Sequence, residues 1–262
     1  MPFLEGTKGF YNKSRIVQGD SRILQLNFRF VPLGLLKTIK QKKKMDKHQG
    51  VDWSALHTVE EMRQLSNLGH WIEGGLFGLI GIIALLQAFG TIKNSMVLWQ
   101  SIVLAAGIFL ISYLLLHHGI AKLPLVWSLV LKDPQQRQHL LIALLLSLAG
   151  CAQILSQVKN IPVLRYGWPL AILIIGILFL VHEQHGSSEA IEWAQRIHKY
   201  LGIILILVSL AFTLNTFFAN RYRWLSIGWP VLLILCAVFL MLYREPPGAF
   251  DDHRTHSNHI KH

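Results

Sequence analysis

The sequence FLVHEQHGSSEAIEWAQRIHKYLG, residues 179–202, joins two apolar segments through a short polar turn. The first segment ends at His182, and His185 follows in the turn. The second segment begins just after His198. Histidines that flank apolar segments recur along this chain, and they direct the prediction of both its fold and its site.

The apolar segments are long enough to cross a membrane. The chain has 262 residues, of which 52% are hydrophobic and 15% charged. Six stretches are nearly free of charge, near 71–92, 96–116, 140–158, 166–181, 200–220 and 224–243. A helical span needs about 20 apolar residues, and lipid leaves the backbone no partner outside the span. The stretches lack the alternation of barrel strands. We predict an all-α polytopic membrane protein with six transmembrane helices.

The six segments resemble three copies of one helical hairpin. A histidine stands at or just before each odd-numbered segment, at His70, His139 and His198. A tryptophan follows 29, 29 and 31 residues later, at Trp99, Trp168 and Trp229. Eight residues beyond these come Gly107, Gly176 and Ala237, and fourteen beyond come Tyr113, His182 and Tyr243. We therefore predict three repeated hairpins, with chance placement of interfacial tryptophans as the alternative.

The remaining parts of the chain differ in composition. Residues 1–44 hold ten Lys and Arg against two acidic residues, which predicts a basic, disordered N-terminal extension, and Met45 is an alternative start. Residues 45–69 are expected to form an interfacial amphipathic helix. The transmembrane domain is expected over 70–245, followed by a His-rich tail over 246–262.

The hairpins place both termini and all thirteen histidines on one side of the membrane. The short turns on the other side carry basic residues and no acidic ones: Lys93, Lys159, Arg165, Arg221 and Arg223. Positive charge in short loops favours the cytoplasmic side, so these turns favour an outward-facing histidine side in a bacterial inner membrane. The basic residues 1–44 favour the opposite orientation.

Side chains that can bind metal gather at one predicted membrane boundary. They are His70, Glu73, His117, His118, His139, His182, His185 and His198. His182 and His185 would share a helix face if the helix continued for one turn beyond the span. Neutral imidazole suits copper, zinc and iron, and it also serves as an axial ligand of haem. The alternative is that each histidine is an ordinary interfacial side chain in contact with water and headgroups.

Two further features bear on metal binding. Glu73 is a carboxylate about one turn inside the first span, where an acidic group is a functional candidate unless it lies at headgroup depth. The tail repeats histidine at three-residue steps, which predicts secondary metal capture or a solvated tail, at His253, His256, His259 and His262.

The histidines at helix ends, His117-His118 and His182-Glu183-Gln184-His185, resemble those of bacterial copper-resistance inner-membrane proteins of the CopD type. The resemblance covers the multi-span region in style, with no motif that matches residue by residue, and it implies copper handling. Cytochrome b561-type proteins are a second likeness, which implies electron transfer through haem b. Those proteins direct histidines toward both membrane faces, whereas all histidines here belong to one.

The sequence thus predicts an integral membrane metal-binding protein that handles copper, with zinc, iron or haem b as alternative cofactors. The competing functions are a haem b electron-transfer protein, a zinc- or iron-dependent membrane enzyme acting on lipid, and a structural or assembly subunit. The expected partners are the lipid bilayer, a metal ion and a membrane or periplasmic protein. Nucleic acid is not expected, because the basic excess is confined to one segment without interleaved aromatic residues.

Overall fold

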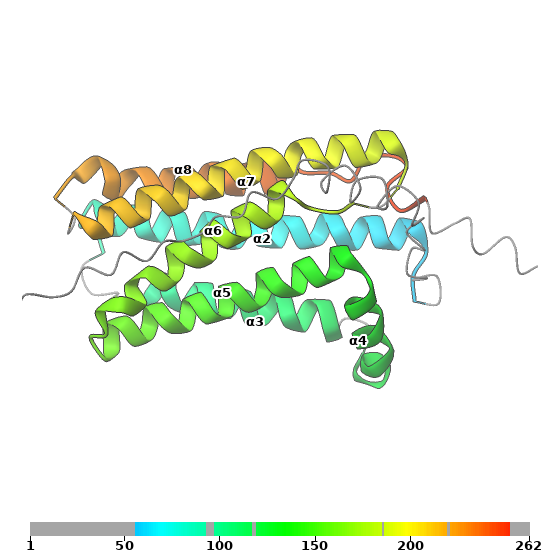
Figure 1. Cartoon of the computed structure of the whole chain (residues 1–262), viewed down its shortest axis with the longest axis horizontal. Coiled ribbons are helices and arrows are strands. Elements are labelled where there is room, and N and C mark those ends of the chain that lie inside the picture. The colour runs from blue at the N-terminus through cyan, green and yellow to red at the C-terminus, as the bar shows by residue number, and fades with distance from the viewer. Residues whose placement is uncertain (1–55, 93–96, 117–118, 185, 219–220, 252–262) are drawn as a thin grey trace, which may run out of the picture. The chain divides into compact units, whose positions relative to one another are not determined.

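The computed structural model describes residues 56–92, 97–116, 119–184, 186–218 and 221–251 (Figure 1). Over these ranges the elements are α2 (Val59–Ala88), α3 (Leu98–Leu116), η1 (Ile120–Lys122), α4 (Leu123–Lys132), α5 (Pro134–Val158), η2 (Pro162–Tyr166), α6 (Gly167–Leu180), α7 (Ser188–Phe217) and α8 (Arg223–Leu242). Six described segments are long and apolar enough to cross a membrane, with η2 and α6 forming one of them. The predicted all-α fold with six such helices is confirmed. Residues 1–55 lie outside the described residues, and with them the predicted extension over 1–44.

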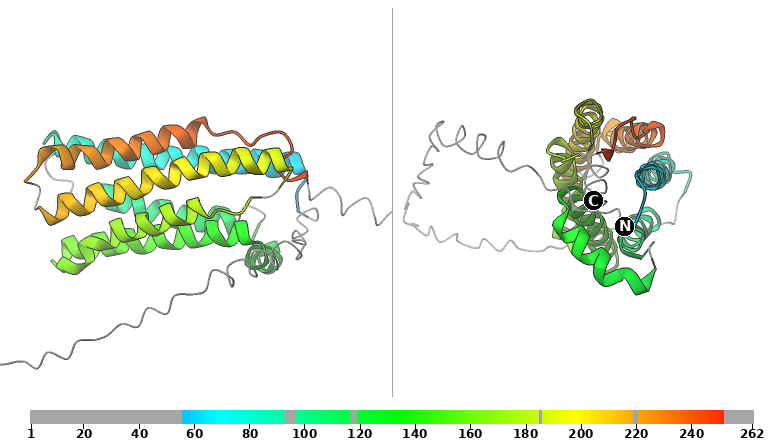
Figure 2. Two further views of the ribbon diagram at one scale, coloured as in Figure 1. Left: turned by 45° about the horizontal axis from the view of Figure 1, so that its top comes forward. Right: turned by 90° about the vertical axis from the view of Figure 1, so that its right-hand side faces the viewer.

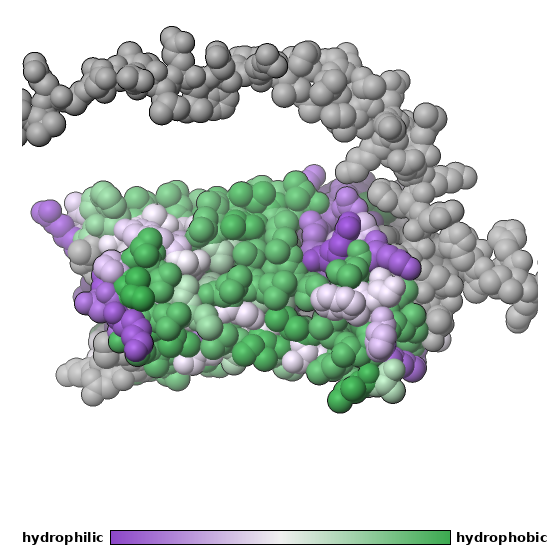
Figure 3. Space-filling model, turned by 60° about the horizontal axis from the view of Figure 1, so that its bottom comes forward, coloured by the Kyte–Doolittle hydropathy of each residue, from purple (hydrophilic) through white to green (hydrophobic). Residues whose placement is uncertain are grey.

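The outer surface of the helices is apolar between two polar ends. Figure 3 shows a hydrophobic band across the middle of the bundle, with polar side chains gathered toward both ends. Large side chains project outward within the helices, for example Leu148, which is 67% exposed, and Leu210, which is 53% exposed. Exposed leucines of this kind are stable in lipid and would be unfavourable in water as one continuous band.

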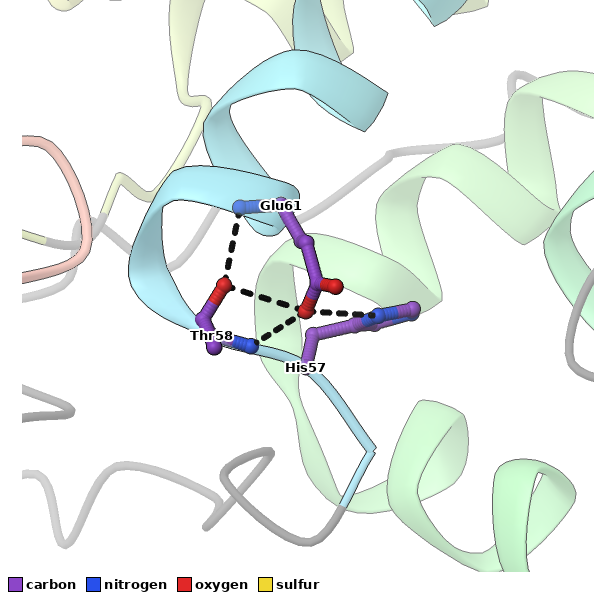
Figure 4. Close-up of polar contacts among 3 residues, drawn as sticks. All are labelled: His57, Thr58 and Glu61. Atoms are coloured by element: carbon purple, nitrogen blue, oxygen red, sulfur yellow. Dashed lines mark hydrogen bonds and ion pairs between the residues drawn. The ribbon is translucent and has the colours of Figure 1, made fainter.

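Polar caps start three of the spanning helices. Thr58 and Glu61 form a reciprocal capping box at the start of α2, in which the Glu61 amide donates to Thr58 Oγ1 over 3.2 Å and the Thr58 amide donates to Glu61 Oε2 over 2.8 Å (Figure 4). The Asp133 carboxylate accepts from the amides of Gln135 and Gln136 before α5. Ser187 caps α7 by accepting from Ala190. Each cap pairs amides that a helix start leaves without an internal partner.

Because of these caps, the odd-numbered spans begin earlier than their apolar stretches suggest. The helices start at Val59, Pro134 and Ser188, whereas the apolar stretches begin near 71, 140 and 200. Residues 59–69, predicted as part of a separate interfacial helix over 45–69, are the first part of α2. The three histidines His70, His139 and His198 therefore lie inside helices rather than at their ends.

The spanning helices form a closed ring, in which each helix packs mainly against two others. Figure 2 shows the bundle end-on. The most extensive contacts join α2 to α8, α3 to α5 and α6 to α7. The consecutive pairs α2–α3, α5–α6 and α7–α8 contact each other less. The closest neighbours therefore belong to different predicted hairpins.

Small residues allow the three closest helix pairs to approach. A Cβ added at Gly150 would lie 2.5 Å from the Leu104 amide nitrogen, and one added at Gly202 would lie 2.7 Å from the Gly176 carbonyl oxygen. Without a hydrophobic driving force in lipid, such close packing is what holds helices together. The three predicted small residues lie at these crossings, with Gly107 against Ala143, Gly176 against Gly202 and Ala237 against Gly74. The contacts repeat at equivalent positions, and the repetition of the hairpins themselves stays a prediction.

The three repeated tryptophans pack inside the bundle. Trp99, Trp168 and Trp229 are 6%, 0% and 5% exposed. The ring of Trp99 lies 5.6 Å from that of Trp168 and 5.7 Å from that of Trp229, measured between centroids. Phe212 adds edge-to-face contacts with Trp99 and Trp229. These tryptophans are thus core residues at one end of the bundle rather than side chains at a lipid interface.

Candidate functional site

Four of the predicted histidines converge at the end of the bundle where α2, α5 and α7 begin. His70, His139 and His198 come from these three helices, and His182 comes from the connection after α6. Ring centroids lie 5.9 Å apart for His70 and His198, 6.5 Å for His70 and His139, 5.4 Å for His139 and His182, and 4.4 Å for His182 and His198. These four residues are named the histidine cluster below.

The three helical histidines share one hydrogen-bonding pattern. The Nδ1 atom of each lies 2.7–2.9 Å from the backbone carbonyl oxygen four residues earlier, which belongs to Ser66, Gln135 or Ala194. A helical side chain leans toward the start of its helix, so the early, capped start of each helix supplies this carbonyl. A carbonyl can only accept, so Nδ1 carries the proton and Nε2 of the neutral ring carries a lone pair.

The histidine cluster is shielded from solvent. His70, His182 and His198 are 8%, 5% and 1% exposed, and His139 is partly buried. Nε2 of His198 is buried and has no hydrogen-bond partner among the described residues. Burial also lowers the pKa of His182, which lies outside the spanning helices, well below its usual value. His182 is therefore a neutral ring with a lone pair at ordinary pH.

A segment after α8 closes this end of the bundle. Residues 243–251, named the closing segment below, begin at Tyr243, whose ring lies 4.3 Å from that of His70 and 5.8 Å from that of His198. The Ser187 amide donates to the Gly248 carbonyl over 2.9 Å, and Gly186 pairs with Ala249 in an isolated bridge. The closing segment therefore reaches across to the connection that carries His182.

Glu245 anchors the closing segment on α2. Its Oε1 accepts a 2.6 Å hydrogen bond from the Ser66 hydroxyl, and its amide donates to Asn67 Oδ1 over 2.7 Å. The carboxylate is nearly enclosed, with 6% of the residue exposed. Burial raises the pKa of the Glu245 carboxyl, against the opposing effect of the Ser66 hydrogen bond. Burial likewise raises the pKa of Tyr243.

Sequence reasoning did not select Tyr243 or Glu245 as site residues. The signal for Tyr243 was present, because Tyr113, His182 and Tyr243 each follow a repeated tryptophan by fourteen residues. Tyr113 lies near the same end, where its hydroxyl donates to the Leu65 carbonyl over 3.1 Å. No comparable spacing marks Glu245, because its position depends on how the chain turns after α8.

The other residues predicted for the site are not part of the histidine cluster as described. Helix α6 ends at Leu180, so His182 does not continue a helical face toward His185. Glu73 is partly buried one turn further along α2 than His70. The predicted site residues His117, His118, His185, His253, His256, His259 and His262 lie outside the described residues.

The cluster as it stands is not arranged around an ion. Among the described residues, no three His, Cys, Asp or Glu side chains form a group that could hold a metal ion. His182 and His198 stack at an interplanar angle of 29°. These side chains must therefore move before they can hold a metal ion. The chemistry that the site offers consists of several neutral imidazoles, one phenol and one carboxyl group in an enclosed setting.

Comparison of the chain with known protein families, with curated proteins and with solved structures gave no match.

Proposed function

We propose that this integral membrane protein binds a metal ion through Nε2 of His70, His139 and His198. The observation that carries the proposal is the shared hydrogen bond from each Nδ1 to the carbonyl four residues earlier. Metal-binding histidines commonly donate their second ring nitrogen in this way, which fixes the tautomer and orients the ring. Three helices thus present the lone pair in the same manner.

Two of the three ring-to-ring spacings suit one shared ion, for which the side chains must first move from their present positions. Metal–nitrogen bonds of about 2 Å place the centroids of two ligand rings roughly 5–6 Å apart. The centroids of His70 lie 5.9 Å from His198 and 6.5 Å from His139. An ion would also satisfy the buried lone pair of His198, which otherwise costs about 1–3 kcal/mol as an unpaired acceptor.

Direct ring contacts favour a small ion over haem b. A haem needs two imidazoles on opposite faces of a wide, flat macrocycle, whereas the rings of His182 and His198 stack at 4.4 Å. Imidazole ligands suit copper, zinc and iron. Copper is the metal that the resemblance to CopD-type proteins suggests, and zinc and iron are the alternatives by ligand chemistry alone.

Elemental analysis of the purified full chain in detergent tests this proposal. The parent should retain about one metal ion per chain, and His198→Ala should retain less than a tenth of that amount. His57→Ala, which removes a histidine outside the cluster, and truncation before His253 should leave the metal content near the parental value. Equal metal content in the parent and His198→Ala would refute the site and would leave its histidines as core residues.

A further inference from the structure

Helix α4 lies across the end of the bundle that holds the histidine cluster, and we propose that it is an interfacial helix seated among phospholipid headgroups. Figure 1 and Figure 2 show α4 running crosswise to the spanning helices, beside the start of α5. Its 10 residues are too few to cross a bilayer, which takes about 20. This inference does not depend on the metal-binding function proposed above.

One face of α4 attaches it to the bundle. Val126 and Val130, one helical turn apart, are both 0% exposed, and they pack with Leu140 of α5. The same small apolar cluster includes partly buried residues of α2 and α3, namely Met62, Ile111, Leu114 and Leu115. A single residue, Asp133, separates α4 from α5. The crosswise position of α4 is therefore fixed by packing and by a tight connection.

The sides of α4 that point away from the bundle carry large apolar residues. Trp127 and Leu131 are four residues apart, which places them on one side of the helix, and each is 44% exposed. Leu125 is exposed on the other flank, which it shares with Lys132. Tryptophan is enriched at the level of lipid headgroups, and an apolar stripe beside a basic flank is typical of helices in the membrane surface. We therefore assign the side with Trp127 and Leu131 to the lipid.

The elements that contact α4 expose apolar residues next to it. Leu116 ends α3, Ile120 follows in η1, and Leu141 lies near the start of α5, and all three are exposed. Each of these elements packs against α4. The exposed apolar residues of α4 thus adjoin the apolar outer surface of the spanning helices. The boundary between acyl chains and headgroups accommodates both surfaces without a break.

Two lysines complement the charge of lipid phosphates. Lys122 precedes α4 and Lys132 is its last residue, and both are exposed. Neither side chain forms an ion pair with another residue in the described ranges. Lysine can keep its apolar stem on a hydrophobic surface while its ammonium group reaches a polar layer. A second copy of the chain would bring the same positive charges to this face, so the lysines favour phospholipid as the occupant.

Spin labels on single cysteines test the position of α4. The full chain, with its native cysteines replaced by alanine, is reconstituted in vesicles of phosphatidylcholine and phosphatidylglycerol. Labels at Leu131→Cys and Leu125→Cys form a matched pair, because these residues are 44% and 45% exposed on different flanks. Leu148→Cys, within α5, is the control for acyl chains, and Glu192→Cys, at an exposed position, is the control for water. Collisions with oxygen report lipid, and collisions with a water-soluble nickel chelate report water.

The ratio of oxygen to nickel collisions at Leu131 should lie between the ratios of the two controls and exceed the ratio at Leu125 by about threefold or more. A ratio equal to that at Glu192 would place α4 in water, and one equal to that at Leu148 would place it among the acyl chains. Either result would overturn the inference, as would equal ratios at Leu131 and Leu125. Protection of Leu131 from both reagents, with spin–spin broadening that disappears on dilution with unlabelled chain, would show a second copy on this face and overturn it too.

Discussion

At the residue scale, the packing of the helices depends on a few positions where a small change has a large steric consequence. Gly150 is one of them, because an added Cβ would lie 2.5 Å from the Leu104 nitrogen and 2.7 Å from its Cα. Backbone atoms cannot move aside as the end of a flexible side chain can. The α3–α5 pair would have to separate, and packing is the main force between helices in lipid.

Gly150→Ala should therefore destabilise the protein by about 1–3 kcal/mol. The matched control is Gly75→Ala, also inside a helix, where nothing lies within 4 Å of the added Cβ. Because alanine favours a helix over glycine by up to about 1 kcal/mol, the control should be neutral or slightly stabilising. Thermal unfolding in detergent measures both. Equal melting temperatures for the two variants would contradict the close approach of α3 and α5.

At the element scale, the closing segment has a backbone that depends on glycine. Gly248 has φ of +87°, and an added Cβ would lie 2.5 Å from Ser187 Oγ. Its carbonyl also accepts the Ser187 amide at the start of α7. This residue is therefore the point at which the closing segment meets the connection that carries His182.

Gly248→Ala should loosen the closing segment without unfolding the bundle. The amides of Ser187 and Asp251, which both donate to Gly248, should exchange with solvent at least tenfold faster. Gly90→Ala is the control, because φ there is +74° but nothing lies within 4 Å. Unchanged exchange at both amides in Gly248→Ala would contradict the described docking.

The sequence predicted elements better than their ends. Apolar stretches identified six spans, because a lipid-facing helix must be apolar over its whole length. The apolar stretches placed His70, His139 and His198 at the beginning of the spans. The first turns of these helices, capped by Thr58, Asp133 and Ser187, are polar and show no apolar pattern. Of the eight residues predicted for the site, His70, His139, His182 and His198 lie together in the structure. The neighbouring Glu245 carries no signal in the sequence, because its position follows from the path of the chain after Leu242. The order in which the helices pack could not be deduced, as the closest pairs do not lie within the predicted hairpins.

At the scale of the whole molecule, the spans fix which connections share a side of the membrane. Basic residues lie in the connections at one end of the bundle. Among the described residues they are Lys159 and Arg165 between α5 and α6, Arg221 between α7 and α8, and Arg223 at the start of α8. The histidine cluster and the closing segment lie at the other end of the bundle. The positive-inside rule therefore favours an outward-facing cluster.

Cysteine labelling should show this orientation. In a chain with Cys151 and Cys236 replaced by alanine, Glu192→Cys on the cluster side should react with an impermeant maleimide in intact bacterial cells. Val163→Cys, at a position 71% exposed in the turn before α6, should react only after lysis. The reverse pattern would place the cluster on the cytoplasmic side and contradict this orientation.

In the proposed site, three helices would direct their imidazole Nε2 atoms to one ion. Anomalous scattering at the zinc edge, from crystals of the full chain loaded with Zn²⁺, tests it most directly. We predict one strong peak about 2 Å from Nε2 of each of His70, His139 and His198. Absence of a peak within bonding distance of these atoms, or a peak only on histidines beyond residue 252, would contradict it.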